Sequence, residues 1–166
     1  MKINDLSGVI HQQPFFKTFT ETQLALLTGC AKNQRFKAET MLAKTGTPAD
    51  HFFVIRSGSI AIEIPVPGRN RLVIQTLGKD AIFGWSWIFP PYHWAFDGRC
   101  QNEVHALVFD GNCLRKKCDD NPDLGYKFMK EFAVLMSQRL EATRLQLSDV
   151  YGHPNQPQTP ERPKTT

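Results

Sequence analysis

The stretch HFFVIRSGSIAIEIPV, residues 51–66, decides the fold class of this chain. Both of its halves are rich in β-branched and aromatic residues, which favour strands. Over positions 60–64 isoleucines alternate with smaller or polar residues, and this two-residue period predicts a strand with one buried face. The halves are joined by residues 56–59, where Gly58 can adopt a positive φ, so the two strands are predicted to form a tight hairpin.

Further short segments with the same period lie on both sides of this stretch. Each is bounded by Gly, Pro or Asp, as antiparallel strands usually are. The segments are AKNQRFKA (31–38), TMLAKTG (40–46), RLVIQTLG (71–78), WAFDGRC (94–100) and EVHALVF (103–109). About seven strands in a chain of 166 residues predict one domain, built as a small sandwich or barrel in the jelly-roll manner.

Helices are predicted before and after the strands. Residues 1–16 indicate a brief helical turn, and Thr20 with Gln23 forms a capping-box pattern for a short helix that ends at Gly29. After the strands, Asp110 is the predicted N-cap of a second short helix.

A long helix is predicted from Asn121-Pro122-Asp123, which combines an N-cap, a first-turn proline and an acid beside the helix dipole. No breaker follows until Gly152, so a helix over about 122–151 would span roughly 40 Å or more. Its second half has little of the domain left to cover. We therefore expect it to pair with the same helix of a second copy, giving a homodimer.

One domain over residues 1–151, including the long helix, is thus expected to precede a tail at residues 152–166. Proline falls at every third position of that tail, among polar residues. This spacing favours an extended, disordered segment without a core.

Composition limits the classes of function. The formal net charge of +4 is scattered along helices and the tail, which is typical of a solvated surface. No apolar run approaches a membrane span and the N-terminus lacks the features of a signal peptide, so a cytoplasmic protein is expected. The four cysteines show no CxxC pair and no zinc-like spacing, so neither a metal site nor a disulfide is expected.

The segment FGWSWIFPPYHWAFDGRC, residues 83–100, holds all three tryptophans. The Pro90–Pro91 pair excludes a continuous helix or a central strand, so a turn or helical stub with an extended return is expected. Large aromatic area beside rigid turns can form the wall of a pocket, of a core or of a partner surface. All three interpretations stay open.

The order of these elements resembles the cyclic nucleotide-binding domain family, in particular the effector half of catabolite-activator-type regulators. The resemblance runs from about Phe15 to Tyr151 and implies a mainly β fold with flanking helices: a double-stranded β-helix, or jelly roll, followed by a short helix and a long C-terminal helix. It rests on HFFVIRSGSIAI, LGKDAIFG (77–84), FDGNCLRKKCDDNPDL (109–124), QRLEATRLQL (138–147) and the succession Gly46, Gly58, Gly78 and Gly84.

The family's phosphate cassette is a Gly-Glu at the start of a short helix, followed by an Arg-Ser or Arg-Thr; amides and the Arg grip the cyclic phosphate. Here Gly84 is kept, Trp85 stands at the Glu position, and Trp94-Ala95 stands at the Arg-Ser position. The family-equivalent ligand pocket comprises Gly84, Trp85, Ser86, Trp87, Trp94, Ala95 and Thr143, and the candidate replacements for the missing cation are Arg99 and Arg144.

The resemblance and its departures predict a non-enzymatic regulatory module for signal transduction. Its ligand would not be cyclic AMP held in the standard mode, and it would act through another small ligand or a protein partner. Two alternatives stay open: a genuine cyclic nucleotide sensor with a rearranged phosphate site, and an interaction scaffold without a ligand. The histidines stand singly, without a metal or catalytic pattern, and residues 152–166 are too few for a helix-turn-helix domain, so neither catalysis nor direct DNA binding is expected.

Overall fold

A computed structural model describes residues 3–68 and 71–151 of the chain. It falls into two units, of which the first ends at Met129 and the second begins at Lys130. The helices are α1 (Ile3–His11), the 3-10 helix η1 (Pro14–Phe16), α2 (Glu21–Thr28), α3 (Gly111–Asp120) and α4 (Pro122–Tyr151). The strands are β1 (Ala31–Phe36), β2 (Met41–Ala43), β3 (His51–Ser57), β4 (Ile60–Ile64), β5 (Leu72–Leu77), β6 (Ile82–Phe83), β7 (Asp97–Cys100) and β8 (Val104–Asp110).

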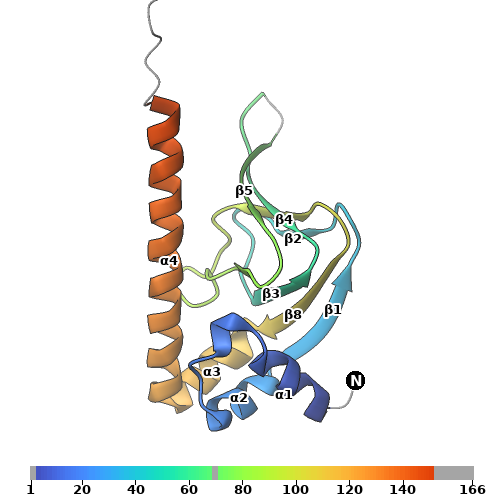
Figure 1. The fold of residues 1–166 in the computed structure, drawn as a ribbon, viewed down its shortest axis with the longest axis vertical. Helices are drawn as coiled ribbons and strands as arrows, with labels where there is room; N and C mark the ends of the chain where they lie inside the picture. The colour runs from blue at the N-terminus through green and yellow to red at the C-terminus, as the bar shows by residue number, and fades with distance from the viewer. Residues whose placement is uncertain (1–2, 69–70, 152–166) are drawn as a thin grey trace, which may run out of the picture. The chain divides into compact units, whose positions relative to one another are not determined.

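The strands form two four-stranded antiparallel sheets, in the orders β1-β8-β3-β6 and β2-β7-β4-β5 (Figure 1). Every predicted strand is present, and the two-residue β6 is an addition that the sequence did not predict. The chain passes back and forth between the sheets, which is the jelly-roll arrangement. The predicted fold class is therefore confirmed.

The predicted hairpin at residues 56–59 is wrong. β3 and β4 belong to different sheets, so this turn carries the chain from one sheet to the other. Gly58 does adopt a positive φ of +85°, but the turn is held by the loop before β8: the Ser59 amide donates to Asn102 Oδ1 over 2.8 Å. The actual hairpin joins β4 to β5, through the loop that follows Ile64.

The burial predicted for β4 is only partly correct. Ile60 and Ile62 are buried, but so are Ala61 and Glu63 on the other face, while Ile64 is 42% exposed. A strand covered on both faces should be apolar throughout. The completely buried Glu63 carboxylate is therefore the unexpected residue of this strand.

Two aromatic clusters form the core of the first unit. One fills the roll between the sheets, where Phe53, Phe83 and Trp94 lie among buried aliphatic side chains. The other lies on the outer face of the β3–β8 pair, where Phe52 and Phe109 contact rings from outside the sheets. These rings are Phe15 and Phe16 of η1, Phe19 in the turn before α2, and Phe128 of α4. The β3–β8 pair is thus buried on both faces.

The helix boundaries follow the predicted capping signals closely. In the capping box of α2, the Gln23 amide donates to Thr20 Oγ1 over 3.2 Å and the Thr20 amide donates to Gln23 Oε1 over 3.0 Å. Asp110 caps α3 as predicted, through a 2.7 Å bond from the Cys113 amide. At the N-terminus, the brief helical turn that was predicted is a nine-residue helix followed by η1. The tail predicted at residues 152–166 lies outside the described residues.

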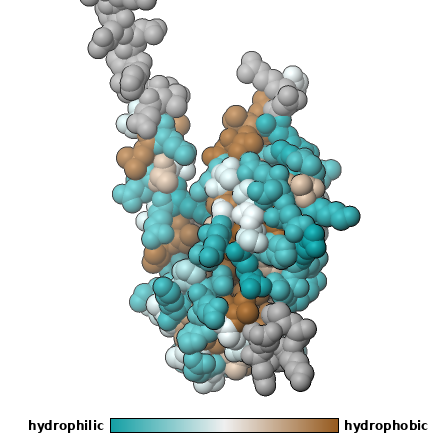
Figure 2. Space-filling view, turned by 45° about the vertical axis from the view of Figure 1, so that its right-hand side comes forward, coloured by the Kyte–Doolittle hydropathy of each residue, from teal (hydrophilic) through white to brown (hydrophobic). Residues whose placement is uncertain are grey.

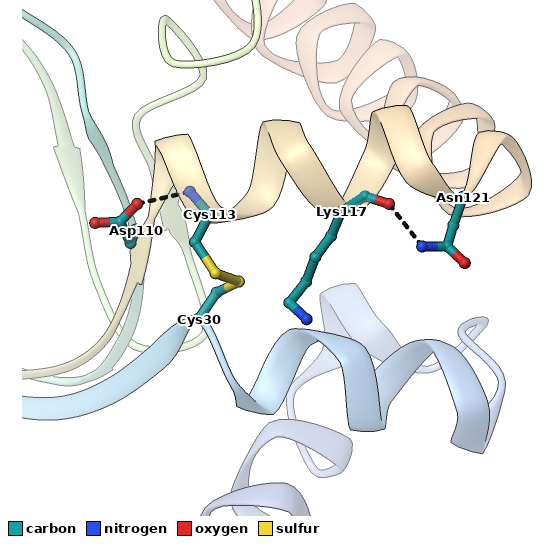
Figure 3. Close-up of a disulfide and its surroundings, with 5 residues drawn as sticks. All are labelled: Cys30, Asp110, Cys113, Lys117 and Asn121. Atoms are coloured by element: carbon teal, nitrogen blue, oxygen red, sulfur yellow. Dashed lines mark hydrogen bonds between the residues drawn. A yellow bond between two sulfur atoms is a disulfide. The ribbon is translucent and has the colours of Figure 1, made fainter.

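The prediction that the cysteines form no disulfide is wrong. Cys30 and Cys113 are joined by one, with their Cα atoms 5.6 Å apart (Figure 3). Cys30 precedes β1, and Cys113 lies in the first turn of α3, which the Asp110 cap fixes beside it. The pair is 83 residues apart in sequence and shares no spacing motif, so only the fold brings it together.

The disulfide should be a major source of stability. A bond that closes an 83-residue loop restricts the denatured chain, so the double variant Cys30→Ser/Cys113→Ser should lose about 2–5 kcal/mol of unfolding free energy. Urea denaturation without reductant measures this loss, and Cys118→Ser, which removes a free thiol, is the control. Equal stability of the wild-type protein with and without reductant would contradict the expectation.

The two free thiols should react slowly in the folded protein. Burial raises the pKa of both Cys100 and Cys118 to about 11, so little thiolate is present near pH 8. The reaction rate of these thiols should rise only as the pH approaches their pKa. Titration with a thiol reagent after denaturation should find two thiols without reductant and four after reduction. Four thiols without reduction would disprove the disulfide.

Candidate functional site

The three tryptophans of residues 83–100 lie in three different environments. Trp94 is 4% exposed and belongs to the cluster inside the roll. Trp87 is completely buried in the outer cluster, where it contacts Phe52 and Phe128 with ring centroids 6.1 and 5.7 Å apart. Trp85 is half-buried and meets the edge of Phe96. The segment is therefore core in two places and a partly exposed wall in the third.

Trp94 is fixed by its backbone as well as by its ring. Its carbonyl accepts a 2.8 Å bond from the Gly46 amide, and its own amide donates to the Thr47 carbonyl over 2.9 Å. The indole stacks on Phe83 with centroids 5.4 Å apart and planes within 5° of parallel. Both the backbone and the ring of Trp94 are thus fixed in place in the roll.

Gly84 lies directly against the Trp94 ring. Its φ is +92°, and a Cβ built on it would come within 2.7 Å of the indole Cη2 atom and 3.2 Å of the His51 carbonyl. Such contacts leave no room for any side chain. The indole therefore packs on the backbone at the glycine where the resemblance predicts the start of the phosphate cassette.

The remaining predicted pocket residues differ in exposure and are divided between the two units. Ser86 is half-buried and Ala95 is exposed. Thr143 and Arg144 belong to the second unit, where both are exposed and the Thr143 hydroxyl donates to the Arg139 carbonyl over 2.9 Å. Within the first unit, Gly84 and Trp94 of the predicted set are in direct contact.

Arg99 is engaged by two carboxylates. Its Nε atom donates to both oxygens of Glu63, over 3.1 and 3.2 Å, and its terminal nitrogens pair with Glu63 and Glu39. The hydrogen bonds that the guanidinium donates, first to Glu63 and then to Glu39, hold its pKa above the usual value. Because Glu63 is completely buried, it needs this cation, so Arg99 is committed to neutralising the roll's own acid.

A second buried acid lies opposite the first. Asp97 on β7 is the register partner of Glu63 on β4, and it is 2% exposed. Its Oδ1 atom accepts bonds from the Thr45 amide and hydroxyl, over 2.8 and 2.9 Å, and its Oδ2 atom pairs with Arg71 at 3.3 Å. Each buried acid of this sheet thus has an arginine of its own.

One positioning residue was missed by the sequence analysis. Arg115 of α3 donates to the Trp87 carbonyl and places its guanidinium 4.4 Å from the centre of the Tyr92 ring. It holds both ends of the loop that contains the cis Pro90–Pro91 bond. Nothing in the sequence pairs α3 with this loop, because the contact arises only from the fold.

The described residues 3–68 and 71–151 contain no group of three side chains arranged to hold a metal ion. Within the same ranges, no helix combines the length and the apolar character that crossing a membrane requires.

The family model of the cyclic nucleotide-binding domain matches residues 33–121, more than half of the chain. This chain therefore belongs to the cyclic nucleotide-binding domain family. No curated protein matches it significantly.

Solved structures share the fold at low identity. A protein of Geobacter metallireducens GS-15 described as a cyclic nucleotide-binding protein has a TM-score of 0.73 and 22% identity, over 81% of this chain and 97% of that one. The sensor domain of the transcriptional regulator DNR from Pseudomonas aeruginosa has a TM-score of 0.67 and 14% identity, over 84% and 93%. The regulatory domain of Toxoplasma gondii PKA, solved with cAMP, has a TM-score of 0.63 and 12% identity, over 78% and 50%.

The packing of Trp94 on Gly84 can be measured with two alanine variants. Gly46 has a similar φ of +81°, but a Cβ at this position would meet no other atom within 4 Å, so Gly46→Ala should cost only the backbone term of about 1–2 kcal/mol. Gly84→Ala should lower the free energy of unfolding, measured by urea denaturation, clearly more than Gly46→Ala does, because it also displaces the indole. In a Trp94→Ala background this excess should shrink to the part due to the His51 carbonyl, and an undiminished excess would contradict the assigned contact.

The pairing of Arg99 with the buried Glu63 predicts that replacing Arg99 destabilises the protein. Arg99→Met leaves a buried carboxylate without its cation, so it should lower the thermal unfolding midpoint more than Arg35→Met does. Arg35 is the matched control because its partner, Glu103, lies at the surface, where ion pairs contribute little. Equal midpoints for the two variants would show that Glu63 does not depend on Arg99.

Proposed function

We propose that this chain is a non-enzymatic regulatory module whose roll does not hold cyclic AMP in the manner of its relatives. The observation that carries the proposal is the contact of the Trp94 indole with Gly84, inside the roll. The resemblance assigns the cyclic phosphate to the amides that begin at this glycine. A ring packed there takes up the space that a ribose and phosphate would need.

Charge supports the same proposal. A buried phosphate without a paired cation faces a desolvation cost of several kcal/mol. Trp94 and Ala95 stand where the family's Arg-Ser is expected, and neither can supply a charge. Arg99, the nearest candidate replacement on β7, already neutralises Glu63 and Glu39. A nucleotide that recruited it would leave a completely buried carboxylate unpaired.

An exposed apolar edge supports action through a protein partner. β5 is the outer strand of its sheet, and Leu72, Val73 and Ile74 on it are 56%, 45% and 41% exposed. Figure 2 shows apolar surface of this kind on the roll, among polar residues. An open strand edge with apolar side chains is a surface on which other chains readily pair.

The second unit supports a homodimer. On α4, Leu140, Leu145 and Leu147 are 54%, 64% and 52% exposed. Large apolar side chains along one helix lose their contact with water when a second helix packs on them. We propose that the partner helix is the same segment of a second copy.

Isothermal titration calorimetry with cyclic AMP and cyclic GMP tests the proposed state of the roll. The wild-type protein should give no heat of binding at micromolar concentration. Micromolar binding that is lost in Arg99→Met or Arg144→Met would overturn the proposal in favour of a rearranged nucleotide site. Cyclic GMP separates loss of the phosphate site, which affects both nucleotides, from a change in base preference.

Light scattering tests the dimer. Leu140→Glu/Leu147→Glu places charges on the apolar side chains and should shift a wild-type dimer to monomer. Gln138→Glu/Gln146→Glu adds the same charge at exposed polar positions of the same helix, so it should leave the dimer intact. A wild-type monomer at high protein concentration would refute the proposed pairing.

A further inference from the structure

The outer face of the β3–β8 pair carries a cavity of about 490 Å³ beyond the aromatic cluster. Four parts of the first unit meet there: the end of α1 with η1, the end of β3, the turn before β6, and β8. The lining residues are Gln12, Gln13, Pro14, Lys17, Arg56, Ser57, Lys79, Asp80 and His105. None of them belongs to the predicted nucleotide pocket, so this is a separate site.

Three cations converge on the cavity from three different elements. Lys17 follows η1, Arg56 lies on β3, and Lys79 lies in the turn between β5 and β6. No ion pair joins any of the three to another residue of the described chain, whereas Arg35, Arg71 and Arg99 all have carboxylate partners. The single carboxylate in the wall, Asp80, leaves the cavity with an excess of positive charge.

A β-bulge lies at Arg56, the cation of the cavity that belongs to β3. In the pairing of β3 with β8, Ile55 lies opposite Ala106 and Ser57 lies opposite His105, so Arg56 is an extra residue on its strand. Ile55 is buried inside the roll, while Arg56 and Ser57 line the cavity outside it. Strand alternation places Arg56 on the outer face after the inward-facing Ile55, and the bulge brings Ser57 to the same cavity beside it.

The wall also contains hydrogen-bonding groups that suit a polar ligand. Gln13 is 7% exposed, and its Nε2 atom donates to the Val9 carbonyl over 3.2 Å. Its Oε1 atom is buried and has no hydrogen-bond partner among the described residues, an arrangement that costs free energy. Asp80 is a second acceptor. An exposed acceptor beside three cations suits a ligand that combines an anionic group with a hydroxyl group.

We propose that this cavity binds a small phosphorylated molecule that carries hydroxyl groups. The phosphate would lie among Lys17, Arg56 and Lys79, and a hydroxyl group would donate to Asp80. The volume lies within the range of small-molecule sites. A nucleic acid or an acidic peptide would need cations spaced along a strip, whereas these three surround one hollow.

The proposal is tested with ribose 5-phosphate as the probe, titrated into the full chain and followed by amide NMR shifts and calorimetry. The wild-type protein should bind it, and ribose alone should produce no shifts up to about 10 mM. Lys17→Gln, Arg56→Gln and Lys79→Gln should each weaken binding about tenfold, since each removes a charge-assisted hydrogen bond. Far-UV circular dichroism checks that each variant is folded.

Two control variants separate this site from other effects. Lys130→Gln removes the same charge from an exposed helical position in the second unit and should change the affinity less than about twofold. Trp94→Ala alters the interior of the roll and should leave the affinity unchanged. The outcome is thus independent of whether the roll itself binds a cyclic nucleotide.

Three results would overturn the proposal. The first is no binding of ribose 5-phosphate up to about 10 mM. The second is an equal loss of affinity in Lys130→Gln and in the cavity variants, which would show a general charge effect. The third is tighter binding of a polyglutamate peptide than of ribose 5-phosphate, lost in the same three variants, which would assign the cavity to an acidic protein.

Discussion

The contact between the Trp94 indole and the backbone of Gly84 is the constraint on which the rest of the roll depends. The backbone of Trp94 is hydrogen-bonded to Gly46 and Thr47, and this fixes the end of the loop formed by residues 85–93. The ring also fills the space between the sheets by stacking on Phe83. A cavity as large as the indole would lower the free energy of unfolding by several kcal/mol. The same ring thus provides packing at the place where the resemblance predicts the ligand space.

The electrostatics of the second sheet agree with a filled roll. Glu63 and Asp97 face each other across β4 and β7, and each is neutralised by its own arginine. Burying such pairs is costly, and they tolerate little rearrangement because removing either partner leaves a charge without compensation. The two arginines are therefore not available to an incoming anion. Three cations for which the described residues show no ion pair, Lys17, Arg56 and Lys79, line a separate cavity outside the roll.

Local signals predicted most of the fold, and long-range pairing accounts for the errors. The Thr20–Gln23 capping box and the Asp110 cap act within one helical turn, so the sequence shows them directly. Gly58 shows only that the chain turns, and whether the flanking strands pair depends on neighbours distant in sequence. Cys30 and Cys113 carry no spacing motif. Arg115 and the bulge at Arg56 were missed for the same reason: both depend on a partner element.

The Cys30–Cys113 bond gives the roll a topology that its strands alone do not. Strands β1 to β8 all lie between these two residues, so the entire roll is enclosed in one covalent ring. A protease that cuts one loop inside that ring opens it without releasing a fragment. Tension applied to the two ends of the chain would run from Cys30 to Cys113 through the sulfur atoms, so the helices outside the ring would stretch while the sheets carried no load.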